Sequence, residues 1–151
     1  MKPEYTKYLH QDAILQLKGE TKKDVLEEII TYATTRCTLG ESQLRELIWK
    51  REKMMTTGVG NGLALPHVRV VDFPSPLVSV GVCNTPITDY KTLDGAPVRL
   101  IVFLAADEKE QDTYLKILGS MSSKLKNQEI VSAVLDAGDD SGKIYSILMQ
   151  D

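Results

Sequence analysis

The chain has few of the residues that build metal centres or disulfide frameworks. Its 151 residues include two cysteines, two histidines and one tryptophan. Cys37 and Cys83 lie far apart and match no zinc-ligand spacing, so no metal site is expected. Both cysteines are interpreted as small core residues.

The chain also lacks an excess of basic charge and any long hydrophobic run. Its 18 lysines and arginines stand against 21 acidic residues, a net charge of -3, whereas nucleic-acid binders usually carry a basic face. No stretch approaches the roughly 18 apolar residues of a membrane helix, and the N-terminal segment has no signal-peptide pattern. We therefore expect a single cytoplasmic domain over residues 1–151 that neither enters a membrane nor binds nucleic acid.

What the sequence does contain is clear helical and strand periodicity. Leu100 to Leu104 are continuously apolar, as in a strand that is covered on both faces. The helix expected over 112–125 carries an apolar stripe of Leu115, Leu118, Met121 and Leu125. Helices are predicted at 20–37, 40–52, 112–125, 127–137 and 141–150, and strands at 12–17, 76–83 and 96–106. This order favours an α/β fold with a mixed β-sheet layered by helices over a doubly wound parallel sheet.

The segment "TTGVGNGLALPH" (56–67) has the glycine spacing of a phosphate-binding loop. A dinucleotide fingerprint needs a preceding strand and a third glycine, but a helix precedes this segment and Leu63 takes that place. A P-loop needs a Gly-Lys-Ser/Thr tripeptide, which is missing from the sequence. Neither a nucleotide nor any other cofactor is therefore expected.

A third interpretation makes the segment a backbone scaffold for His67. Glycines permit left-handed backbone conformations and close approach of another segment, and Pro66 restricts the chain just before the histidine. "GLALP" is then a short strand that ends in His67. The alternative is that His67 merely terminates a strand; the glycines, the proline and the nearby Arg51 and Arg69 favour a reactive histidine.

The longer segment "REKMMTTGVGNGLALPH" (51–67) resembles the active-site signature of the enzyme IIA domains of the bacterial phosphoenolpyruvate-dependent phosphotransferase system, in the fructose, mannitol and nitrogen-regulatory class. The likeness extends over "TKKDVLEEIITYATT" and over residues 93–125, and so covers nearly the whole chain. "GNG" and "REKM" are closer to the nitrogen-regulatory subgroup. The matching residues are Arg51, Glu52, Thr57, Gly58, Gly60, Asn61, Gly62, Pro66 and His67.

The resemblance implies a mixed sheet with helices on both faces and a phosphotransferase component that works through a phosphohistidine at His67. It implies an HPr-like protein as phosphoryl donor, and an enzyme IIB or a regulatory target protein as the next partner. Three hypotheses follow: a regulatory phosphocarrier, which we favour, a sugar-transport component, and a protein-binding module that has lost phosphotransfer.

Two residues depart from the family pattern. Most members carry a second histidine at the start of the helix after the central strand, and here that position is Tyr114. Tyrosine donates a hydrogen bond but carries no positive charge, so transfer is expected to be slower or lost. Val68 stands where the family commonly has a small residue.

Several side chains are candidates to support a phosphoryl group on His67. Arg51 supplies positive charge or is a solvated arginine at a helix end, and Arg69 shares the face of His67 or is a surface charge. Thr57 and Asn61 donate hydrogen bonds or shape the loop, while Tyr114 approaches His67 or lies at the edge of the core. His10 is expected at the surface, and Trp49 is expected to pack against the core.

Overall fold

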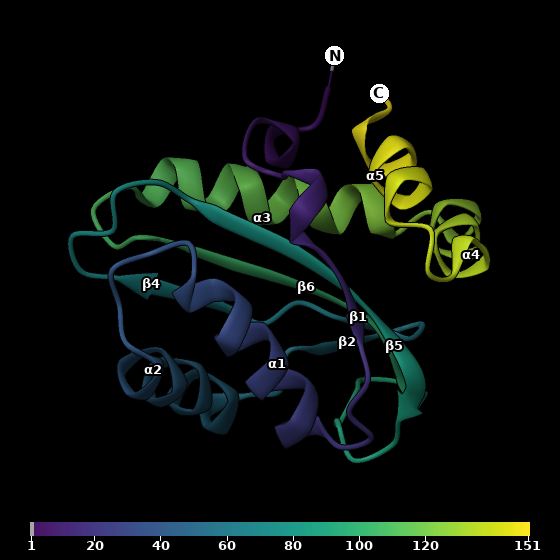
Figure 1. Cartoon of the computed structure of the whole chain (residues 1–151), viewed down its shortest axis with the longest axis horizontal. Coiled ribbons are helices and arrows are strands. Elements are labelled where there is room, and N and C mark those ends of the chain that lie inside the picture. Colours follow the sequence, from purple (N-terminus) through teal and green to yellow (C-terminus); the bar gives the residue numbers. More distant parts are fainter. Residues whose placement is uncertain (1) are drawn as a thin grey trace.

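The structure is a computed structural model that describes residues 2–151. Its centre is a six-stranded sheet in the order β1-β5-β6-β3-β2, with β4 also paired to β6 (Figure 1). The strands are β1 (Ile14–Leu17), β2 (Gly58–Gly60), β3 (Leu63–Ala64), β4 (His67–Val70), β5 (Leu77–Ile87) and β6 (Val98–Asp107). The helices are α1 (Lys22–Thr34), α2 (Glu41–Met54), α3 (Gln111–Leu125), α4 (Gln128–Ala137) and α5 (Ser141–Met149), with 3-10 turns η1 (Glu4–Lys7) and η2 (Gln11–Ala13).

Helices cover both faces of the sheet, which confirms the expected fold class. In Figure 1, α1 and α2 lie on one side of the sheet, and α3, α4 and α5 lie on the other. The buried strand β6 divides two cores because its side chains alternate between the faces. Leu100, Val102 and Leu104 pack with the α3–α5 layer, and Ile101 and Phe103 pack with α1 and α2.

The strand directions bring the start of β4 to the end of the sheet where α3 begins. β6 is antiparallel to β5 and parallel to both β3 and β4. His67 pairs with Leu104, close to the carboxyl end of β6, and α3 follows β6 after a short turn. The resulting corner holds residues from α2, β4 and α3.

The first two residues of the predicted apolar stripe of α3 were wrong by one position each, because Tyr114 and Ile117 take the places expected for Leu115 and Leu118. Leu115 is 52% exposed, whereas Tyr114 and Ile117 are buried. The spacing of Tyr114, Ile117, Met121 and Leu125 is as regular as that of the predicted stripe, so periodicity alone did not distinguish the two. Docking of the helix on β6 decides between them and turns Tyr114 inward.

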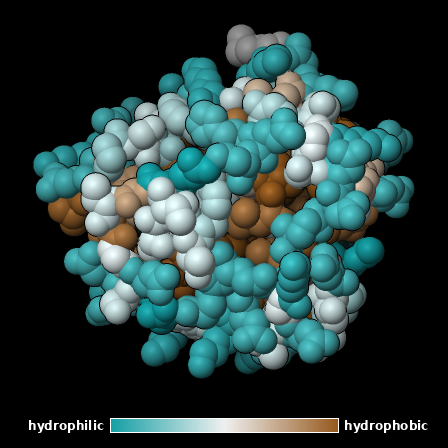
Figure 2. Space-filling model, in the orientation of Figure 1, coloured by the Kyte–Doolittle hydropathy of each residue, from teal (hydrophilic) through white to brown (hydrophobic). Residues whose placement is uncertain are grey.

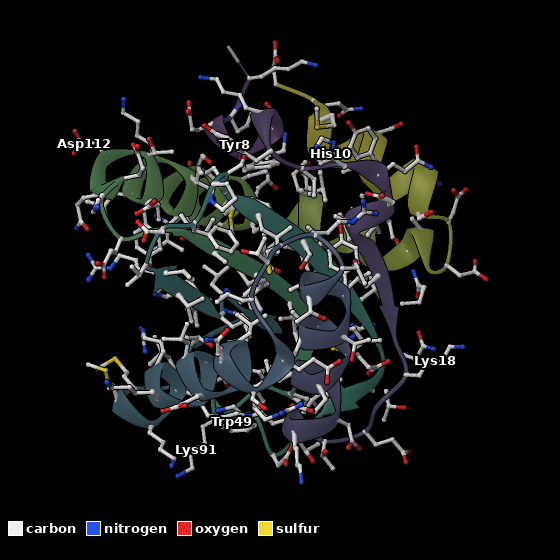
Figure 3. All side chains as sticks on the ribbon, turned by 60° about the vertical axis from the view of Figure 1, so that its left-hand side comes forward. Tyr8, His10, Lys18, Trp49, Lys91 and Asp112 are labelled. Carbon is white, nitrogen blue, oxygen red and sulfur yellow. The ribbon has the colours of Figure 1, made fainter. Side chains whose placement is uncertain are left out.

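The structure confirms the expected positions of Cys83, Trp49 and His10, whereas Cys37 is only partly buried. Cys83 is buried, Cys37 is half-buried, and Trp49 packs against the α1–α2 core. His10 is exposed, at the end of the molecule away from Trp49 (Figure 3). On the face shown in Figure 2 the surface is mainly hydrophilic, and hydrophobic residues show at its centre, where β1 and β5 pass between the helix layers. Among residues 2–151, no helix is both long and apolar enough to span a membrane.

Gly60 occupies a turn that only glycine adopts easily. Its φ is +108°, and an added Cβ would lie 3.2 Å from the Asp94 carboxyl group. We expect Gly60→Val to lower the free energy of unfolding by about 1–3 kcal/mol, because a β-branched residue is strained at this φ. Urea unfolding measures the change. Gly119→Ala is the matched control, since Gly119 is helical with open space around it and should gain about 0.5–1 kcal/mol. Equal stability of Gly60→Val and the wild type would contradict the expectation.

Candidate functional site

His67 is the first residue of β4, and not the last residue of the strand before it. The expected "GLALP" strand is reduced to β3, Leu63–Ala64, and the chain passes through Pro66 before β4 begins. The Pro66 carbonyl accepts a hydrogen bond from the Leu104 amide at 3.1 Å, so β6 holds the chain on both sides of this step. His67 lies at the end of the sheet in either case, opposite Leu104.

One hydrogen bond fixes the tautomer of the His67 ring. Nδ1 lies 2.6 Å from the Leu65 carbonyl oxygen, and since a carbonyl only accepts, Nδ1 carries the proton. Nε2 therefore keeps its lone pair. Among residues 2–151, no side chain or backbone group hydrogen-bonds to Nε2, so this nitrogen is available to react.

Burial keeps the ring neutral near pH 7. Partial burial lowers the pKa of His67 below its usual value; the Leu65 carbonyl acts in the opposite direction, and Arg51 lowers the pKa further. Glu52 raises the pKa and Arg69 lowers it, both as smaller effects. The group thus has the protonation state of a nucleophile at neutral pH.

His67 borders an open depression of about 810 Å³ that is rich in basic side chains. The polar and charged residues that line it with His67 are Lys50 and Arg51 from α2, Arg69 from β4, Glu108 and Lys109 from the turn after β6, and Gln111 and Tyr114 from α3. Four basic groups against one carboxylate make the depression suitable for an anion.

Tyr114 faces His67 across this depression. The two ring centroids are 6.0 Å apart with an interplanar angle of 57°. Arg69 lies over the Tyr114 ring at 5.6 Å and donates a hydrogen bond to Gln111. The Tyr114 hydroxyl forms no hydrogen bond with any part of the chain between residues 2 and 151, and burial raises its pKa, so it remains a neutral donor.

Arg51 borders the depression from the end of α2. Its Nη1 donates a 2.8 Å hydrogen bond to the Met55 carbonyl, one of the unpaired carbonyls expected at a helix end. This contact holds the guanidinium close enough to His67 to affect its pKa. Arg51 therefore binds a carbonyl at the helix end, and its charge acts on the His67 ring.

The structure does not bring Thr57 and Asn61 to the depression. The buried Thr57 hydroxyl donates to Glu52 at 2.5 Å and pairs with the Tyr90 hydroxyl at 2.6 Å.

Asn61 is exposed in the turn between β2 and β3, and its backbone amide donates to Asp94. The carbonyl of the neighbouring Gly62 accepts a hydrogen bond from the Arg99 amide of β6. His67 pairs with Leu104, five residues further along β6, so at the rise of a strand the Asn61 turn and His67 are about 16 Å apart. The contacts of both residues therefore favour the loop-shaping alternative over direct support of a phosphoryl group.

The glycine segment folds back into a tight hairpin under the 91–95 loop. A Cβ on Gly58 would lie 2.2 Å from the Lys91 carbonyl oxygen, so any side chain there would clash with backbone. Gly60 and Gly62 both have positive φ, and the Gly62 carbonyl accepts hydrogen bonds from the Arg99 and Leu100 amides. The glycines therefore shape the hairpin at a distance from His67, whereas Pro66 directly precedes it.

Sequence reasoning missed a buried polar cluster beneath this hairpin. The Glu52 side chain is 2% exposed and pairs with Lys22 at 2.9 Å as well as with Thr57. The Lys22 ammonium lies over the rings of Tyr90 at 4.5 Å and Trp49 at 5.5 Å. A signal was available, because Glu52 follows Leu44 and Ile48 at a spacing of four on the buried stripe of α2.

Comparison with known proteins agrees with this geometry. The fold is that of an enzyme IIA domain. Residues 7–150 match the family described as "Phosphoenolpyruvate-dependent sugar phosphotransferase system, EIIA 2", and the chain belongs to this family.

The relatives include nitrogen regulatory proteins and fructose-system components. It is 34% identical over 138 residues to a nitrogen regulatory protein of Bradyrhizobium diazoefficiens, covering 91% of this chain and 89% of the relative. It is 30% identical over 138 residues to the fructose-specific EIIABC component of Bacillus subtilis, but spans only 22% of that protein's length. The nitrogen regulatory protein IIA-Ntr from Neisseria meningitidis has the same fold, with a TM-score of 0.87, 25% identity and coverage of 95% and 97% of the two chains. A complex of enzyme IIA mannitol with phosphorylated enzyme IIB from Escherichia coli shares the fold at 19% identity and a TM-score of 0.65, covering 93% and 96% of the two chains.

Proposed function

We propose that the protein is a phosphocarrier that accepts a phosphoryl group from an HPr-like protein on Nε2 of His67. The observation that carries the proposal is the ring itself: Nδ1 is held by Leu65, and Nε2 is left free beside a basic depression. Membership of a phosphoenolpyruvate-dependent phosphotransferase family supports a donor from that system.

The chemistry follows from these contacts. The Nε2 lone pair attacks the phosphorus of the donor phosphohistidine, the donor's P–N bond breaks, and its electron pair returns to the donor imidazole. The His67 ring then carries a positive charge, which the Leu65 carbonyl stabilises through the Nδ1 proton. Arg51 and Arg69 neutralise charge on the equatorial phosphoryl oxygens, because such transfers have loose transition states that depend on electrostatic positioning.

Within this proposal we favour a regulatory role over sugar transport. Relatives named nitrogen regulatory proteins match along most of their own length, and the fold agrees with IIA-Ntr at a TM-score of 0.87. Replacement of the family's second histidine by Tyr114 also suits a slow signal better than rapid sugar flux. The sugar-specific alternative passes the phosphoryl group to an enzyme IIB.

The test is incubation with phosphoenolpyruvate, enzyme I and HPr, followed by intact mass measurement. We expect one acid-labile phosphoryl group per chain, and none when enzyme I is omitted. Purified IIB domain of a fructose system is then added. Retention of the phosphoryl group supports the regulatory role, and rapid discharge supports sugar transport. A wild-type protein that takes no phosphoryl group would contradict phosphotransfer and leave the protein-binding alternative.

Tyr114 is expected to tune the rate of transfer. Its ring centroid lies 6.0 Å from that of His67, and in the proposed phosphoprotein its hydroxyl donates one neutral hydrogen bond to a phosphoryl oxygen. Tyr114→Phe should slow phosphorylation by about two- to tenfold, the factor that corresponds to a bond of ~0.5–1.5 kcal/mol. Tyr114→His should speed phosphorylation or prolong the phosphorylated state, since a charge-assisted bond is about twice as strong. Phosphorylation time courses measure both, with Tyr145→Phe on α5 as the matched control. Unchanged kinetics in both Tyr114 variants would remove this role.

A further inference from the structure

A continuous series of hydrogen bonds joins the buried carboxylate of Glu52 to the ring of His67. Glu52 accepts hydrogen bonds from the hydroxyl of Thr57 at 2.5 Å and from its backbone amide at 3.4 Å. The Thr57 carbonyl accepts from the Leu65 amide at 2.9 Å. The Leu65 carbonyl in turn accepts the Nδ1 proton of His67 at 2.6 Å. Two residues, Thr57 and Leu65, thus link the Glu52 charge under the hairpin to Nδ1 of His67, the ring nitrogen opposite the reactive Nε2.

The carboxylate at the start of this series is held rigidly. One Glu52 oxygen pairs with the Lys22 ammonium at 2.9 Å, and the other takes the Thr57 proton. Because that proton is directed to Glu52, Tyr90 is the donor in its own 2.6 Å contact with the Thr57 hydroxyl. The Lys22 ammonium is fixed in turn by the Tyr90 and Trp49 rings. Neither carboxylate oxygen is free to turn away from the hairpin.

We propose that Glu52 and Thr57 are positioning residues for His67: they fix the Leu65 carbonyl that selects the Nδ1-protonated ring and accepts its charge during transfer. This inference rests on the proposed function and names residues that act through another group. A rigid Leu65 carbonyl keeps Nε2 free and directed to the depression, and the negative charge at Glu52 favours the ring that becomes positive as the Nε2–P bond forms.

Other charged groups also act on the ring, and the test has to separate them from Glu52. They surround His67 from every neighbouring element: Lys50 and Arg51 on α2, Arg69 on β4, Glu108 and Lys109 after β6, and Tyr114 on α3. None of them takes part in the series from Glu52 to Leu65, so variants of Glu52 and Thr57 leave all of them in place.

The experiment compares Thr57→Val with the wild type, with Thr57→Ser as the conservative rescue and Tyr90→Phe as the matched control. Valine replaces the hydroxyl with a methyl group and removes the shorter of the two Thr57–Glu52 bonds, leaving only the 3.4 Å contact of the backbone amide. Serine retains the shorter bond. Tyr90→Phe removes the other contact of the same hydroxyl but leaves the series intact. Nitrogen NMR of the His67 ring reports tautomer and pKa without any phosphotransfer, and mass-based time courses report the phosphorylation rate per folded protein.

We expect Thr57→Val to convert His67 from the single Nδ1-protonated tautomer to a mixture, and to slow phosphorylation about fivefold, within the range of one hydrogen bond. Thr57→Ser and Tyr90→Phe should keep the wild-type tautomer. As a second variant, Glu52→Gln should lower the pKa of His67 further, because the charge that raises it is lost.

Three outcomes would overturn the inference. One is an unchanged tautomer and rate in folded Thr57→Val. The second is an equal change in Tyr90→Phe, which would indicate general loosening of the cluster. The third, decisive if Thr57→Val does not fold, is an unchanged His67 pKa in Glu52→Gln. A wild-type protein that accepts no phosphoryl group contradicts the proposed function instead, and the ring measurements remain readable in that case.

Discussion

Replacing His67 with alanine is expected to abolish phosphorylation completely. The other histidine, His10, is exposed at the end of the molecule away from α2 and has no glycine hairpin or basic depression beside it. His67 alone combines a fixed Nδ1 proton, a free Nε2 and nearby arginines. After incubation with phosphoenolpyruvate, enzyme I and HPr, intact mass should show one phosphoryl group on the wild type and none on His67→Ala.

The control for this prediction is His10→Ala, which removes a histidine from the surface and should be phosphorylated at the wild-type rate. The acid lability of the label distinguishes phosphohistidine from a phosphate ester. Label that persists on His67→Ala would show that another residue accepts the phosphoryl group, and the assignment of the site would be wrong.

Replacing Lys22 with methionine is expected to destabilise the fold strongly. The Lys22–Glu52 pair is nearly enclosed, with side-chain exposures of 15% and 2%, and methionine keeps the apolar stem while removing the charge. Breaking a buried pair leaves its partner without compensation and typically lowers the free energy of unfolding by about 3–5 kcal/mol. For a chain of this size that corresponds to a fall in Tm of roughly 10 °C.

Thermal and urea unfolding followed by circular dichroism measure this change. Lys23→Met is the matched control, because Lys23 is the next residue of α1 and is exposed to solvent. Its stability should stay within about 0.5 kcal/mol of the wild type. A Lys22→Met protein as stable as Lys23→Met would show that Glu52 finds other compensation, and that Lys22 does not hold the cluster.

Periodicity predicted the layout of the fold because it follows directly from which faces are buried. The continuous apolar run at 100–104 is indeed the central strand. The α3 stripe failed at Leu115, since two registers of the same helix satisfy the same spacing and only contact with β6 selects one. The length of the strand expected in "GLALP" was overestimated: only Leu63 and Ala64 form β3, because its apolar residues are buried against β6 without forming a long ladder.

The sequence by itself determined the fold class and the candidate nucleophile. Gly58, Gly60 and Pro66 impose local backbone limits that hold in any context, and the run into His67 follows from those limits and from its likeness to a known signature. Only the tertiary structure decided which side chains surround the histidine. Thr57 and Asn61 are six to ten residues from His67 in sequence yet turn to Glu52 and Asp94, while Tyr114, 47 residues away, meets its ring. The physical reason is that β6 pairs with β3, β4 and β5 at once. The pairing that sets His67 beside Leu104 also brings the start of α3 to His67. No local pattern in the chain encodes this contact between segments that are far apart in sequence.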